Sequence, residues 1–134
     1  MTSPVWADIE TVGSHEPMFV GPEDTLRHVA GLMWARSVGA LLVGGPRCLL
    51  GIISERDLAT AIAQGADPDT ATAAGAMSHD IVSLRPGDTL YDAAVDMLDV
   101  GIRHVPVVDE HGTVQGMVSV RDLLRPLLVR ALGG

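Results

Sequence analysis

Apolar residues along this chain alternate between short continuous runs and stripes with helical spacing. The runs at 18–20, 40–43 and 48–53 are typical of buried strands. Apolar residues spaced three and four apart predict helices over 26–34 and 55–64. The pattern therefore predicts strand, helix, strand, strand and helix in this half of the chain.

The same order of elements returns 64 to 65 residues later. The equivalent segments are predicted strands at 81–84, 105–108 and 113–119 and predicted helices at 90–98 and 120–132. Repetition of a whole set of elements at this spacing indicates an internal duplication. The predicted boundaries are 1–65 for a lead-in and the first repeat, 66–75 for a linker of small residues, and 76–134 for the second repeat.

Length and composition favour two repeats that share a core. The chain has 134 residues, and a folded unit of about 60 residues is only marginally stable by itself. Hydrophobic residues make up 47% of the chain and the mean hydropathy is +0.29. We expect the excess apolar surface to pair the repeats, and also to pair chains.

Charge and cysteine content exclude several classes of partner. The formal net charge of −8 disfavours non-specific binding to nucleic acid or to an anionic membrane. Neither a long apolar run nor a signal-peptide pattern occurs, so we expect a soluble cytoplasmic protein without a membrane partner. The single cysteine, Cys48, forms no intrachain disulfide and is expected to be a buried, inert thiol.

The sequence most informative for function lies where a predicted strand becomes a helix. Ser54 can cap the helix, and Asp57 can reach back to the cap. A helix N-terminus also binds anions, so Ser54 could donate to a phosphate, Arg56 could pair with it, and Asp57 could accept from ribose hydroxyls. Capping alone explains the serine and the aspartate but not the arginine.

The second repeat carries the same residues at the same place. Ser119, Arg121 and Asp122 stand 65 residues after their counterparts, and a glycine precedes both copies, at 51 and 116. Repetition of the arginine and the glycine favours a binding role over capping alone.

These motifs, in this order and repeated, resemble a tandem cystathionine-β-synthase-type (CBS) domain pair, or Bateman module, over residues 5–132. The residues that carry the resemblance are 51–57, 116–122, 103–109, 76–78 with 81–84, and 86–90. The resemblance implies an α/β (α+β) fold of two pseudo-symmetric β-α-β-β-α repeats packed through their sheets. It also places the two Ser-x-x-Asp helix starts in related clefts between the halves.

The resemblance further implies a regulatory module that binds an adenosyl ligand and requires no cofactor. Candidate ligands are AMP, ADP, ATP and S-adenosylmethionine. Asp57 and Asp122 would hold the ribose, and Ser54 and Ser119 would help to bind phosphate. The base would lie among strand residues, for which the candidates are Met18, Val20, Leu41, Val82, Leu84, Val105 and Pro106.

The two repeats differ around this predicted site. Leu42 stands where the second repeat has Pro106, and Gly39-Ala40 stand where it has Arg103-His104. We therefore expect the two sites to bind the ligand with unequal affinities, and in the extreme case only one of them to be occupied. For His104, contact with phosphate or base and packing against the neighbouring repeat stay open as alternatives.

The sequence is also compatible with other functions. The resemblance implies a homodimer formed through helices, with an unidentified effector protein as a further partner. A ligand-free dimerisation module with clefts closed by Leu42 is the main alternative, and a metal or redox sensor using His79, His104 or Cys48 is a weaker one. Neither zinc-ligand spacing nor a catalytic motif occurs, so we do not expect an enzyme. Trp34 is equally compatible with a core and with a dimer interface.

Overall fold

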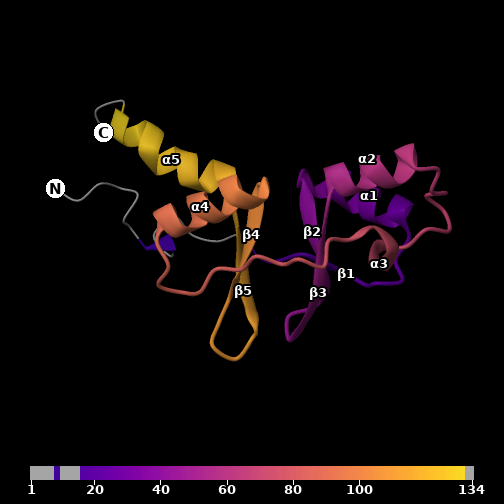
Figure 1. Cartoon of the computed structure of the whole chain (residues 1–134), viewed down its shortest axis with the longest axis horizontal. Coiled ribbons are helices and arrows are strands. Elements are labelled where there is room, and N and C mark those ends of the chain that lie inside the picture. Colours follow the sequence, from indigo (N-terminus) through magenta and orange to yellow (C-terminus); the bar gives the residue numbers. More distant parts are fainter. Residues whose placement is uncertain (1–7, 10–15, 132–134) are drawn as a thin grey trace. The chain divides into compact units, whose positions relative to one another are not determined.

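The computed structural model describes residues 8, 9 and 16–131, and it confirms a mixed α/β fold (Figure 1). The elements in chain order are β1 (Phe19–Val20), α1 (Leu26–Arg36), β2 (Ala40–Gly45), β3 (Cys48–Ser54), α2 (Glu55–Ala63), α3 (Ala73–Ala76), α4 (Leu90–Val100), β4 (His104–Val108), β5 (Val114–Ser119) and α5 (Val120–Ala131). None of the helices among the described residues is long and apolar enough to cross a membrane.

Packing divides the chain into two compact units. The first-repeat unit consists of residues 18–81. The second-repeat unit consists of residues from 82 onward together with part of the N-terminal lead-in, including Asp8 and Ile9. The boundaries 1–65, 66–75 and 76–134 describe sequence equivalence and stay a prediction, because packing groups the chain by spatial contact instead.

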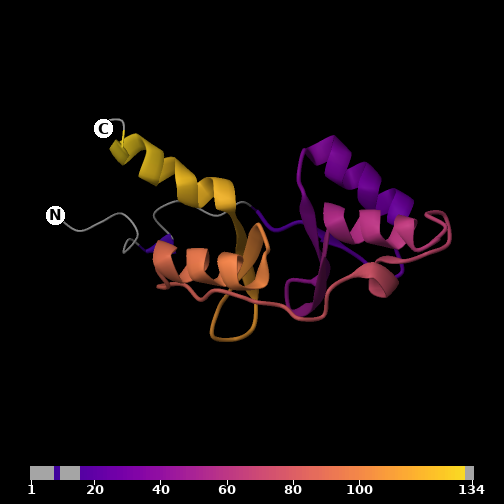
Figure 2. The same ribbon diagram turned by 45° about the horizontal axis from the view of Figure 1, so that its top comes forward.

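The first-repeat unit has a three-stranded sheet with the order β1-β2-β3. β1 runs parallel to β2, and β2 runs antiparallel to β3. Helices α1 and α2 lie side by side in both views and pack on this sheet (Figures 1 and 2). Between helices and sheet lies a core of Val20, Leu26, Val29, Met33, Leu41, Val43, Ile53 and Ala73.

The predicted linker packs tightly against this unit. Ala73 is fully buried in the core, because its backbone N–H donates to the Asp24 carbonyl at 2.8 Å and holds the segment against the start of α1. The carbonyl of Ala71 accepts from the N–H of Leu26 at 3.0 Å. The connector therefore supplies acceptors that the first turn of α1 lacks within the helix.

The second-repeat unit has an antiparallel pair of strands, β4 and β5, with α4 and α5 packed on it (Figure 1). The strand predicted over 81–84 is wrong, because only Leu84 pairs, in a parallel bridge with Val107. The chain turns on both sides of this bridge. The N–H of Ile81 donates to the His79 carbonyl, and the N–H of Asp88 donates to the Arg85 carbonyl, both at 3.0 Å.

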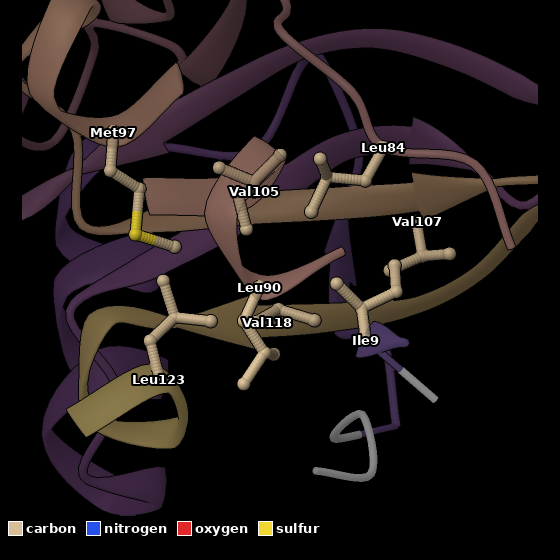
Figure 3. Packing of buried hydrophobic residues seen from close by; sticks show 9 residues of the cluster. Ile9, Leu84, Leu90, Met97, Val105, Val107, Val118 and Leu123 are labelled. Carbon is tan, nitrogen blue, oxygen red and sulfur yellow. The ribbon is translucent and has the colours of Figure 1, made fainter. Parts of the chain in front are cut away.

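The core of the second-repeat unit includes a residue from the far end of the chain. Ile9 lies among the side chains of Leu84, Leu90 and Val118 (Figure 3), and it is 2% exposed. Its N–H donates to the carbonyl of Asp88 at 2.8 Å. The lead-in therefore completes the core of the second repeat rather than that of the repeat it precedes.

Three side chains are more exposed than the sequence suggests. Cys48, expected to be buried, is exposed at the first position of β3, beside the hairpin turn. Leu98 falls at the helical spacing of the apolar residues in the helix predicted over 90–98, which predicts burial, but it is 83% exposed, because the buried side of α4 is formed by Leu90, Ala93 and Met97. Trp34, at the equivalent position of α1, is 86% exposed, which excludes a core position.

Candidate functional site

Helix α2 begins at a reciprocal hydrogen-bonded pair. The backbone N–H of Asp57 donates to Ser54 Oγ at 3.2 Å, and the N–H of Ser54 donates to Asp57 Oδ2 at 2.8 Å. Ser54 Oγ also donates to Asp57 Oδ2 at 2.9 Å. All three bonds hold the aspartate through one carboxylate oxygen, so its position is set by the backbone of the strand-to-helix turn.

Helix α5 begins with the same arrangement. The N–H of Ser119 donates to Asp122 Oδ2 at 2.7 Å, its Oγ donates to the same oxygen at 3.0 Å, and the N–H of Asp122 donates to Ser119 Oγ at 3.3 Å. Asp122 is only 5% exposed, whereas Asp57 is half-buried. The duplicated sequence therefore builds two local structures with matching bonds and different exposure.

A third capping box shows what the cap alone can produce. At the start of α4, Thr89 and Asp92 make the same three bonds, at 2.8, 3.0 and 3.1 Å. The residue before this aspartate is Tyr91, where the other two boxes have an arginine. Cap geometry alone is thus not a mark of a binding site.

The arginines distinguish the two predicted sites from the third box. Arg56 and Arg121 are exposed and each lies in the first turn of its helix, between the capping serine and the aspartate. Each turn therefore presents a hydroxyl, a guanidinium and a carboxylate at the positive end of a helix. This combination can bind an anion and a pair of hydroxyls at one place.

Strand pairing brings two further candidates to the second site. His104 lies directly opposite Ser119 in the β4–β5 ladder, and the carbonyl of Arg103 accepts from the N–H of Val120 at 2.8 Å. Arg103 is exposed and His104 is half-buried. The second-repeat unit therefore gathers Arg103, His104, Ser119, Arg121 and Asp122 around one helix start.

The first site has the same backbone but smaller side chains. Ala40 lies opposite Ser54 in the β2–β3 ladder, and the carbonyl of Gly39 accepts from the N–H of Glu55 at 3.0 Å. Neither Gly39 nor Ala40 can donate a side-chain hydrogen bond. The sequence difference between the repeats thus falls next to the helix start in each unit.

Most of the residues predicted to surround a base point into hydrophobic cores. Val20 and Leu41 belong to the core of the first-repeat unit, and Leu84 and Val105 belong to that of the second (Figure 3). Their side chains are thus committed to packing within their own units. Met18 and Val82 are half-buried, and the Met18 carbonyl accepts from the N–H of Leu42 at 2.9 Å.

Successive side chains of a strand point to opposite faces of the sheet. Pro106 follows Val105 and Leu42 follows Leu41, so both lie on the faces turned away from these cores. Neither side chain belongs to the two core clusters, yet both are less than 2% exposed, so neither Leu42 nor the base-site candidate Pro106 presents an open surface in this structure.

Two further residues, Met77 and Ser78, lie beside the first site, where the sequence alone does not indicate them. Met77 and Ser78 run along β3, where Ser78 and Ile52 exchange hydrogen bonds of 2.8 and 3.1 Å. A Cβ atom on Gly51 would lie 2.6 Å from Met77 Sδ and 2.7 Å from the Ser78 carbonyl oxygen. The glycine before Ser54 therefore permits this close approach, a backbone reason for its place in the motif.

Metal binding finds no support in the described part of the chain. Its His, Cys, Asp and Glu side chains form no group of three or more that could hold an ion.

A family model for the CBS domain matches this chain twice, over residues 7–64 and 73–129. The chain belongs to the CBS domain family. The two matches make it a CBS pair, which confirms the resemblance drawn from its repeated motifs.

Named relatives are similar over most of this CBS pair. The CBS domain-containing protein YhcV of Bacillus subtilis is 37% identical over 78% of this chain and 74% of its own length. An uncharacterized protein of Methanopyrus kandleri, MK0525, is 31% identical over 83% of this chain, which spans only 59% of that protein. The CBS domain protein PAE2072 of Pyrobaculum aerophilum, solved in complex with AMP, is 27% identical to this chain. Its structure matches with a TM-score of 0.83, and the match covers 96% of this chain and 100% of PAE2072.

Proposed function

We propose that this CBS pair is a regulatory module, not an enzyme, that binds an adenosyl ligand at the strand-to-helix turn of one or both units. The carboxylates of Asp57 and Asp122 would accept from ribose hydroxyls. Arg56 and Arg121 would pair with phosphate, and the hydroxyls of Ser54 and Ser119, which in this structure donate to the aspartates, would turn to donate to it. The ligand is AMP, ADP, ATP or S-adenosylmethionine.

The observation that carries this proposal is the pairing of an arginine with a capping box at two equivalent helix starts. Capping needs only a hydroxyl side chain and an aspartate, as the Thr89–Asp92 capping box shows. An arginine at both positions adds the charge that a phosphate requires, beside backbone N–H groups at the positive end of the helix dipole.

The relative from Pyrobaculum aerophilum supports the choice of ligand class. It was solved in complex with AMP and is 27% identical to this chain over nearly the whole length of both. An adenosine carrying one phosphate matches the combination of carboxylate, hydroxyl and guanidinium at each helix start.

We propose that binding is read out through association, either with a second copy of this chain or with an effector protein. Ligand binding shifts association only as far as the ligand binds the two states with different affinity. The exposed apolar residues Trp34 and Leu98 supply surface on which such association can act.

Thermal unfolding with AMP, ADP, ATP and S-adenosylmethionine tests the proposal. A ligand present at 100 times its dissociation constant adds about 2.7 kcal/mol to the free energy of unfolding. The informative variants are Asp57→Asn and Asp122→Asn. Asp92→Asn is the matched control, because it disturbs a capping box of the same geometry that lacks the arginine.

We expect all three variants to lose some intrinsic stability and only the first two to lose a ligand-induced shift. Loss of the shift in one of them identifies the occupied site. If a folded protein shows no shift with any of the four ligands, the ligand-free dimerisation module becomes the better account.

A further inference from the structure

The two proposed ligand sites differ in charge at the first residue of the helix. Helix α2 begins with Glu55, and helix α5 begins with Val120, which stands 65 residues later in the chain. Both side chains are exposed. Both backbone N–H groups donate to the residue just before a strand, at the carbonyls of Gly39 and Arg103. The same backbone position therefore carries a carboxylate in one unit and an aliphatic side chain in the other.

The first site has an excess of negative charge. Arg56 lies between the carboxylates of Glu55 and Asp57 in the first turn of α2, and the facing residues Gly39 and Ala40 carry no charge. A phosphate monoester carries about −1.5 to −2 charges at pH 7. A phosphate that pairs with Arg56 is therefore also repelled by the two carboxylates beside it.

The second site has an excess of positive charge. Arg121 and Arg103 are both exposed beside the start of α5, against the single carboxylate of Asp122 in its first turn. Neither arginine forms an ion pair with another residue that the structure describes, so both guanidinium groups are available to an added anion. The two sites thus differ by two unit charges, even with His104 neutral.

Helix capping does not explain this difference. A carboxylate in the first turn suits the positive end of any helix dipole, so capping favours a glutamate equally at the start of α2 and of α5. Helix α5 nevertheless forms with Val120 at this position, and Arg103 lies outside that helix. The charge difference is therefore free to serve ligand selection.

We propose that the two sites select adenosyl ligands by the charge of the group on the 5′ carbon of the ribose. The second site takes a ligand with a 5′ phosphate, of the AMP type. The first site takes a ligand with a cationic 5′ group, of the S-adenosylmethionine type, whose sulfonium is attracted by Glu55. The proposal rests on the adenosyl binding put forward above and adds which ligand each site prefers.

Glu55 is the residue that sets this preference at the first site. Its carboxylate attracts a sulfonium and repels a phosphate, so it moves the two affinities in opposite directions. An exposed pair of charges changes a binding constant by up to about fivefold, and salt reduces this effect. Charge selection therefore predicts a preference that shrinks at high ionic strength, whereas a preference due to shape would persist.

Each site is measured alone by disabling the other. Asp122→Asn leaves the first site, and Asp57→Asn leaves the second. Titration calorimetry of both variants with AMP, adenosine and S-adenosylmethionine gives the ratio of the affinities for AMP and S-adenosylmethionine. We expect this ratio to be at least about tenfold higher at the second site, because the two sites differ by two unit charges.

Reciprocal substitutions test the role of Glu55 directly. In the Asp122→Asn background, Glu55→Gln should shift the affinity ratio about fivefold towards AMP. In the Asp57→Asn background, Val120→Glu should shift it by a similar factor towards S-adenosylmethionine. The affinity for uncharged adenosine should change little in either variant. Glu110→Gln is the matched control, since Glu110 is exposed in the β4–β5 turn and should leave both ratios unchanged.

The two proposals fail separately. Equal affinity ratios at the two sites overturn charge selection and leave adenosyl binding standing, and so does a ratio that Glu55→Gln does not change. A first site that binds none of the three ligands overturns its assignment to a cationic ligand, while binding at the second site still supports the regulatory module. A folded wild-type chain that binds none of them overturns both proposals.

Discussion

His104 lies directly across the β4–β5 ladder from Ser119, whereas Ala40 occupies that position opposite Ser54. The two units therefore share a backbone arrangement and differ in the side chain beside the capping serine. This difference gives the second of the proposed sites a hydrogen-bond donor that the first lacks, because imidazole donates a hydrogen bond and a methyl group does not.

The first prediction concerns phosphate binding at the second site. Arg103→Ala and His104→Ala should each weaken binding of AMP about tenfold, the factor for loss of a charge-assisted hydrogen bond of about 1.4 kcal/mol. Titration calorimetry with AMP and with adenosine measures the effect. Adenosine lacks the phosphate, so its affinity should change little.

Arg47→Ala is the matched control, since Arg47 is exposed at the β2–β3 turn of the other unit. An equal loss of affinity for adenosine and AMP would show that His104 acts through packing instead of through phosphate. An unchanged affinity in both variants would place the occupied site in the first-repeat unit.

The second prediction concerns the caps. Ser54→Ala and Ser119→Ala should each lower the free energy of unfolding by about 1 kcal/mol, because each leaves a backbone N–H of the first helical turn without its acceptor. Thr89→Ala should cost a similar amount. Urea unfolding of the single variants measures the loss, and a near-zero effect in all three would contradict the cap geometry.

The third prediction concerns the glycine of the motif. Gly51→Ala should destabilise the first-repeat unit by about 1–3 kcal/mol, because its Cβ would overlap the Ser78 carbonyl, which belongs to paired backbone. Gly45→Ala is the control, since nothing lies within 4 Å of its Cβ position. Thermal unfolding compares the two variants, and equal melting temperatures would argue against the close approach.

Features that depend on neighbouring residues in the sequence could be predicted. Ser54 with Asp57, and Ser119 with Asp122, form the expected caps because a cap is closed within one helical turn. The repeat also predicted the equivalent elements, since the same local sequence favours the same local structure. The caps at the two helix starts are therefore predictable from the local sequence.

Features that depend on distant partners could not be predicted. Ile9 belongs to the core of the second-repeat unit, and no local pattern links it to Leu84. Leu84 forms one bridge instead of a strand because turns on both sides limit its pairing. Helical periodicity placed Leu98 with other apolar residues, but it does not say which apolar side of a helix the core covers.

The last prediction is a pH dependence at α4. Burial, followed by the nearby carboxylates of Asp88, Asp92 and Asp99, raises the pKa of Asp96 above its ordinary value of 3.8. The folded state then binds more protons than the unfolded state between the two pKa values, so stability falls as pH rises through this window. The full cost is present at neutral pH and disappears below pH 3.8.

Asp96→Asn should therefore stabilise the protein at pH 7, by about 0.5 kcal/mol from relief of like-charge pairs one helical turn apart, and have no such effect in acid. Asp109→Asn is the control of opposite sign, because the backbone N–H of Thr113 holds the pKa of Asp109 below its ordinary value. It should destabilise at neutral pH.

Urea unfolding at several pH values, at two protein concentrations, separates this effect from dimerisation, since only an effect on association changes with concentration. A gain from Asp96→Asn that persists unchanged in acid would show that the gain does not come from relief of charge repulsion among the carboxylates of α4.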